Sequence, residues 1–297
     1  MARAFAAMTM IPHAQLRAFA RVAARLLHDN SARAGGARPL RARAGAGLEF
    51  LDHRDYQPGD ELRRIDWRQS ARQQRTIVRR YQLESSTDWY LCVDASSSMC
   101  SSDANKWQLA VHCANAMGYV LLEMGFRVGM LLFADQVVGA CPAGRGVSHY
   151  LRLNQLTQRG VPLATGAGSQ LGSCLGRIGA GATAFVISDF LAADQLRRDL
   201  AALRTACASV HALHLSAVAD SNLNTRGHVT LVDRENGEQL DVVATAEVAA
   251  RAARYLQQGR STLQGFCRAQ ALQFSAWDSA CHWRSVLLGH LSAAQRH

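Results

Sequence analysis

The sequence predicts an α/β fold in which a doubly wound, mostly parallel sheet is covered by helices on both faces. Strand-like and helical segments alternate from Thr87 onward, which is typical of parallel sheets. The segments "YLCV" (90–93) and "AFVI" (184–187) are continuous apolar runs, as strands buried on both faces require. The chain of 297 residues is 48% hydrophobic, so it has enough apolar side chains for a large core.

The main domain begins with the strand Trp89–Asp94, followed by a helix from about Asn105 to Met124. The apolar residues of this helix repeat at helical spacing, and Gly125 suits its C-cap. The later elements are expected in this order: strands at 126–135 and 136–141, short helices at 148–160 and 169–179, a strand at 183–190, a helix at 192–207, a strand at 209–218, a polar hairpin turning at Asn236-Gly237, a long helix at 245–269, a strand at 271–278 and a closing helix that ends at Leu291.

The N-terminal stretch is rich in arginine and has no acidic residue before Asp29. This composition resembles an organelle transit peptide. An amphipathic helix is favoured instead, because Pro12 and Asn30 bracket an apolar stripe like start and stop signals. The predicted regions are a helix (1–31), a flexible Gly/Ala/Arg linker (32–46), a β-rich appendage (47–86) and the main domain (87–297) with a hairpin insertion (226–244).

The formal net charge of +10 raises the question of a nucleic-acid or acidic partner. However, Lys106 is the sole lysine among 33 basic residues, so the excess reflects an arginine bias and does not favour nucleic acid. The eight cysteines contain no C-x-x-C pair and are interpreted as buried free thiols of a reducing compartment. No apolar run approaches the ~18 residues of a membrane span. We therefore expect a cytoplasmic protein without a membrane span.

Oxygen-bearing side chains follow two strands of the predicted sheet. Asp94, Ser96 and Ser98 come at the end of the first strand, and their alternate spacing lets all three point the same way. Asp189 ends the strand "FVISD", and Ser169 starts a helix beside it. Ligands of open α/β sheets bind beyond the carboxyl ends of strands, and Mg²⁺ prefers six oxygen ligands at about 2.1 Å. These five residues are therefore candidate metal ligands, directly or through water.

This pattern, Asp-x-Ser-x-Ser with a later hydroxyl and a later Asp, resembles the metal-ion-dependent adhesion site of von Willebrand factor A domains. The likeness covers roughly residues 87–297. The chain is still more similar to a bacterial family of unknown function, number fifty-eight in its series, which joins such a domain to an upstream motif. That motif is found here as "GLEFLDHRDYQPGDELRRIDWRQSAR" (47–72), and "VISDF" and "VTLVDRENG" also resemble family blocks.

The resemblance implies a non-enzymatic Mg²⁺-dependent interaction module, with Mn²⁺ or Ca²⁺ as substitutes in vitro. One coordination position would stay open for an acidic side chain of a protein partner, and a MoxR-type AAA+ ATPase is the expected associate. The family usually has Gly-Gly-Thr-Asp-Leu where this chain has Ala167-Gly168-Ser169-Gln170-Leu171. The serine keeps the hydroxyl, but Thr165 is an alternative fifth ligand.

Other interpretations remain open. Asp and Ser also dominate turns and helix N-caps, so Asp94, Ser96 and Ser98 alone are equally compatible with a turn. Four arginines of the appendage are candidates for partner docking or for salt bridges to the main domain: Arg54, Arg63, Arg64 and Arg68. Two other functions stay as alternatives. One is a metal-dependent phosphoester hydrolase, and the other is an arginine-rich nucleic-acid binder with salt-dependent affinity.

Overall fold

A computed structural model describes most of the chain, which forms two units. The larger unit comprises residues 1–36 and 87–297, and the smaller comprises 37–86. No helix in the described part is long and apolar enough to cross a membrane. The described residues are 10–33, 48–56, 65–83, 88–100, 104–159, 168–191, 193–217, 227–232 and 238–293.

The larger unit is built on a six-stranded sheet with the order β10-β7-β6-β3-β4-β5. Its strands are β3 (Trp89–Asp94), β4 (Val128–Phe133), β5 (Val137–Gly144), β6 (Thr183–Ser188), β7 (Ser209–Ser216) and β10 (Gln273–Asp278). All neighbours pair in parallel except β4 and β5. Strands β4 and β5 follow β3 on one side of it, and β6, β7 and β10 then follow on the opposite side of β3. The strand order therefore reverses between β3 and β6. The predicted doubly wound α/β fold is confirmed.

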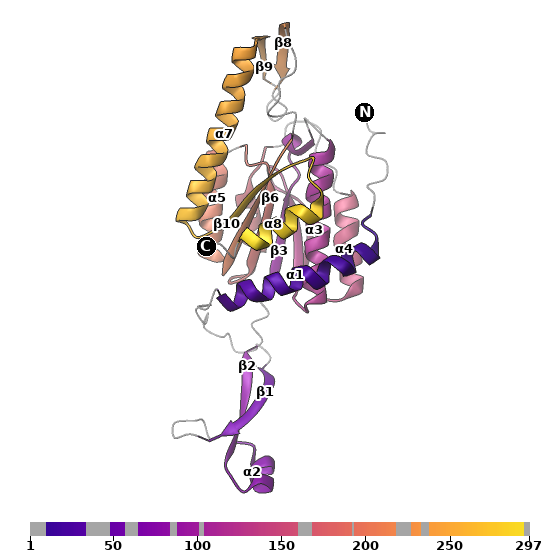
Figure 1. Ribbon diagram of the computed structural model, residues 1–297, viewed down its shortest axis with the longest axis vertical. Helices are drawn as coiled ribbons and strands as arrows, with labels where there is room; N and C mark the ends of the chain where they lie inside the picture. The colour runs from indigo at the N-terminus through magenta and orange to yellow at the C-terminus, as the bar shows by residue number, and fades with distance from the viewer. Residues whose placement is uncertain are drawn as a thin grey trace. The chain divides into compact units, whose positions relative to one another are not determined.

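Helices cover both faces of this sheet (Figure 1). One face carries α3 (Ala104–Glu123), α4 (Val147–Arg159) and α8 (Trp283–Ala293), and α1 (His13–Arg33) packs against α3 and α8 as a further layer. The other face carries α5 (Ala193–Ala206), α7 (Ala246–Ala269) and a 3₁₀ helix, η3 (Leu171–Arg177). The helix expected at 169–179 is therefore a 3₁₀ helix.

The strand β3 shows why the central strands of the sheet are apolar. Leu91 and Val93 point into the core beneath α3 and α8, whereas Tyr90 and Cys92 point into the core beneath α5 and α7. Successive side chains of a strand face opposite sides, so a strand between two helical layers must be apolar at every position. This double burial places the polar end of β3 at the rim of both cores.

The smaller unit contains an antiparallel pair, β1 (Leu48–Asp55) and β2 (Ile77–Leu83), as expected for a β-rich segment. It also contains a short helix, α2 (Trp67–Gln73), which the sequence interpretation did not include. Asp66 caps this helix by accepting hydrogen bonds from the backbone N–H groups of Arg68 and Gln69.

In the larger unit, β8 (Gly227–Val232) and β9 (Gln239–Ala244) form the antiparallel hairpin that was predicted. Its turn at Asn236-Gly237 lies outside the described residues.

The cysteines were predicted to be buried free thiols. The seven cysteines whose side chains the structure describes are all free, and six of them are buried, while Cys281 is half-buried. The prediction of free thiols is confirmed for these seven.

Candidate functional site

The candidate site begins where β3 ends, at Asp94. The backbone N–H of Ser96 donates to Oδ1 of Asp94 at 2.9 Å, so the carboxylate closes a turn on its own backbone. The Ala95 N–H donates to the carbonyl of Phe133 at 2.7 Å and extends the ladder between β3 and β4 by one more bond. Ser96 directly precedes a 3₁₀ turn, η2 (Ser97–Cys100), and Ser98 lies inside that turn. The turn interpretation of this motif is therefore correct, and it holds the serines beside the carboxylate.

Two more hydroxyls reach the same carboxylate from distant segments. Oγ of Ser169 donates to Oδ2 of Asp94 at 2.7 Å, and Oγ of Ser188 donates to the same oxygen at 2.6 Å. The register explains the second contact, because Val93 pairs with Ile187 and the next residues along the two strands are Asp94 and Ser188. The contact of Ser169 is supported by its neighbour Gln170. The N–H of Gln170 donates to the carbonyl of Ala134 at 2.7 Å and so fixes the segment before η3 to the end of β4.

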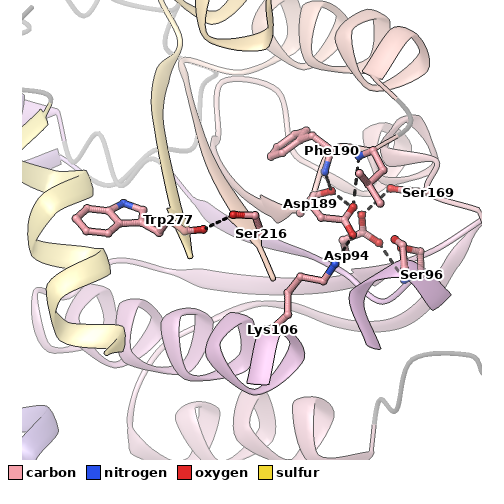
Figure 2. Close-up of polar contacts among 11 residues, drawn as sticks. Asp94, Ser96, Lys106, Ser169, Asp189, Phe190, Ser216 and Trp277 are labelled. Carbon is pink, nitrogen blue, oxygen red and sulfur yellow. Dashed lines mark hydrogen bonds and ion pairs between the residues drawn. The ribbon is translucent and has the colours of Figure 1, made fainter. Parts of the chain in front are cut away.

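The second carboxylate of the site is Asp189, which directly follows β6. Its Oδ2 accepts a hydrogen bond from Nζ of Lys106 at 2.9 Å, and its Oδ1 accepts the N–H of Leu191 at 3.4 Å. The Lys106 side chain has no exposed surface and that of Asp189 is 3% exposed, so this ion pair is buried. Figure 2 shows Lys106 reaching from α3 toward the two carboxylates.

The negative charge of Asp189 acts on Asp94. The pKa of Asp94 is raised from 3.8 to about 6, first by burial and then by the negative charge of Asp189. Hydrogen bonds from Ser188, Ser96 and Ser169 act against this rise because they stabilise the charged form. A cation placed between these groups would relieve their repulsion.

The backbone next to Asp189 is strained. Phe190 has a φ of +49°, which is rare for a bulky side chain, and its N–H donates to Oγ of Ser188 at 2.9 Å. Its ring stacks on His214 with the planes 15° apart, and burial lowers the pKa of His214 to about 4. Such strain costs on the order of 1–3 kcal/mol and is typical of functional sites.

The donor set fits a hard cation such as Mg²⁺. Oγ of Ser96 and Oγ of Ser98 lie 3.0 Å apart, and neighbouring ligands of an octahedral ion at about 2.1 Å are separated by about 3.0 Å. The proton of Ser169 is engaged by Asp94, so its oxygen lone pairs remain for a cation. In the described part of the chain, no group of three or more His, Cys, Asp or Glu side chains is arranged so that it could hold a metal ion. Any ion here would depend on hydroxyls supported by two carboxylates.

The structure brings together four of the predicted ligands in direct contacts, namely Asp94, Ser96, Ser98 and Ser169, and Figure 2 shows Asp189 beside them. Thr165, the alternative fifth ligand, lies outside the described residues. The same is true of Arg63, Arg64 and the side chain of Arg54, whereas the Arg68 side chain is exposed on α2.

Sequence reasoning missed two residues of this site, Ser188 and Lys106. A signal for Ser188 was its position as the last residue of a buried strand, directly before a candidate ligand. A signal for Lys106 was its status as the sole lysine in an arginine-rich chain.

Residues 52–262 match the family described as "Protein of unknown function DUF58", which is more than half of the chain. The chain belongs to this family. The resemblance to family number fifty-eight is thereby confirmed.

The chain is also similar to individual proteins. It is 30% identical to the uncharacterized protein Rv1480 of Mycobacterium tuberculosis over 65% of this chain and 62% of that protein. The chain thus spans less than two thirds of this relative's length. Among solved structures, it is similar to the conserved hypothetical protein BatB from Bacteroides thetaiotaomicron, with 14% identity, a TM-score of 0.35 and coverage of 62% of this chain and 98% of that one. An aerotolerance-related membrane protein from Bacteroides fragilis gives 15% identity, a TM-score of 0.36 and coverage of 71% and 100%.

Proposed function

We propose that this protein is a non-catalytic interaction module in which a bound divalent cation, Mg²⁺ in the first place, coordinates an acidic side chain of a protein partner. The observation that carries the proposal is the convergence of oxygen donors from three separate segments at one sheet edge. Ser96 and Ser98 follow β3, Ser169 precedes η3, and Asp189 follows β6, all around the carboxylate of Asp94. This edge lies where the strand order reverses, which is the usual ligand position of doubly wound sheets.

The burial and the hydrogen bonds of Asp94 support a binding role better than a role as a catalytic nucleophile. Its side chain has no exposed surface, and both of its oxygens already accept hydrogen bonds. A carboxylate held in this way is suited to orienting the hydroxyls and to balancing charge, while an attacking nucleophile must reach its substrate. When bound, the cation would supply a Lewis-acidic position that attracts a carboxylate.

The partner is proposed to be a MoxR-type AAA+ ATPase in the cytoplasm, on the strength of the family resemblance. Such a partner would have to present an Asp or Glu side chain to this edge of the sheet. Mn²⁺ and Ca²⁺ are also oxygen-seeking ions and are expected to replace Mg²⁺ in vitro.

The proposal is tested by measuring Mn²⁺ binding to the full chain and the capture of partners from native lysate. Wild type, Asp94→Ala and Ser216→Ala are compared, each with the divalent ion and with EDTA. Ser216 is a matched control, because its hydroxyl ends β7 at the same sheet edge but donates to the carbonyl of Trp277 (Figure 2). We expect wild type and Ser216→Ala to bind Mn²⁺ and to retain a partner only with the ion present. Equal retention in all samples would show that the site is not the binding surface.

A further inference from the structure

A buried lysine lies inside the candidate metal site. Lys106 occupies the first turn of α3, its side chain is fully buried, and its ammonium group bonds to Asp189 at 2.9 Å. The position is costly for two reasons. Burying a charge carries a desolvation penalty even when it is paired, and a positive charge near a helix N-terminus opposes the helix dipole. Stability therefore gives little reason for a lysine here, and a role in the site's chemistry gives a better one.

The charges of the site decide what that role can be. Asp94, Asp189 and Lys106 together carry one net negative charge when both acids are ionised. A divalent cation alone would turn this into one net positive charge in a place sheltered from water. A divalent cation together with one carboxylate from a partner would make the group neutral. In a buried setting the neutral combination is the favoured one, because unbalanced charge is weakly screened there.

We propose that Lys106 is a built-in cation that weakens binding of a divalent ion alone and strengthens its binding together with a partner's carboxylate. Metal and partner then bind cooperatively, and the unpartnered protein holds its metal weakly. This inference rests on the proposed function and adds the regulation of the same site. The linkage is reciprocal, so an acidic ligand must raise metal affinity by the same factor by which the metal raises acid affinity.

The test compares wild type with Lys106→Met, which keeps a side chain of similar length without the charge. Mn²⁺ binding is counted by electron paramagnetic resonance, alone and with N-acetyl-glutamate amide as the carboxylate probe. N-acetyl-glutamine amide is the neutral control, and Ser216→Ala is the control variant. We expect Lys106→Met to bind Mn²⁺ alone about tenfold more tightly than wild type, within the range of ordinary coupling. The glutamate probe should raise Mn²⁺ affinity in wild type and lose most of that effect in Lys106→Met.

The outcomes separate the two proposals. If wild type binds Mn²⁺ but Lys106→Met binds it equally or more weakly, Lys106 is only a structural partner of Asp189 and the inference is wrong, while the proposed function stands. If neither protein binds Mn²⁺ with or without the probe, the proposed function fails and the inference fails with it. If circular dichroism shows that Lys106→Met is unfolded, the comparison of the two probes on wild type tests the inference. Equal effects of the glutamate and glutamine probes on the Mn²⁺ affinity of wild type would then overturn it.

Discussion

Replacing Asp94 by asparagine should make the metal-free protein more stable at neutral pH while abolishing metal binding. Burial, together with the charge of Asp189, raises the Asp94 pKa from 3.8 to about 6. That difference corresponds to about 3 kcal/mol of destabilisation once the group is ionised, because each tenfold change in proton affinity is worth about 1.4 kcal/mol. The amide can still accept the Ser96 N–H, and its NH₂ can donate to the hydroxyls of Ser169 and Ser188. Rearranging these bonds costs about 1 kcal/mol, so the net gain is about 2 kcal/mol.

The pH dependence follows from the sign of the shift. The folded state binds the Asp94 proton more tightly than the unfolded state, so this group lowers wild-type stability as pH rises from about 4 to about 6. The amide side chain of Asp94→Asn does not titrate, so the advantage of this variant should grow over the same interval and stay constant above it. Urea unfolding in EDTA at pH 4.5 and pH 7.5, followed by circular dichroism, measures both differences. A variant that is less stable than wild type at pH 7.5 would refute the reasoning.

Three further predictions concern the rest of the fold. Gly289→Ala should cost about 1–3 kcal/mol of unfolding free energy, because a Cβ there would overlap the Trp277 ring. Gly265→Ala, in α7, should gain about 0.5–1 kcal/mol, because a Cβ there would meet no other atom within 4 Å. Thermal unfolding of both variants measures these differences. Of the seven cysteines whose side chains the structure describes, Cys281 should react first with iodoacetamide in the native protein, as peptide mapping by mass spectrometry would show. Asp66→Ala should cost α2 about 1 kcal/mol through the lost N-cap, measured as faster amide exchange at the start of that helix.

The sheet was predictable from sequence because its strands are buried on both faces. In these strands the apolar run continues to the last residues of the strand, as at 90–93 and 184–187. The run therefore predicts both the presence of a strand and the position at which it ends. The same property made the site predictable, since Asp94 and Asp189 stand where those runs stop. Parallel strands bring such ends to one edge, and this holds whatever the intervening chain does.

The 3₁₀ geometry of η3 could not be foreseen from local pattern. Gly172 lies inside it, and its N–H donates to Oδ2 of Asp199 on α5 at 2.8 Å. A Cβ at this position would approach that carboxylate within 2.9 Å, so the contact requires glycine. This is a tertiary contact between segments 27 residues apart, and it satisfies an N–H in the first turn of η3 that has no acceptor within the helix. In the smaller unit, by contrast, the missed helix α2 had a local signal in Asp66, a good N-cap residue.

Lys106 illustrates how compositional bias can become informative. In this chain nearly every cation is arginine, so an exposed position that only needs a positive charge would be expected to carry arginine. Position 106 is fully buried, and its charge must end beside one carboxylate oxygen of Asp189. A guanidinium is planar and carries five donors that would each need a partner in that space, whereas an ammonium is compact. The sole lysine of an arginine-biased chain therefore marks a place where the size of the cation matters, and in this protein that place is the candidate metal site.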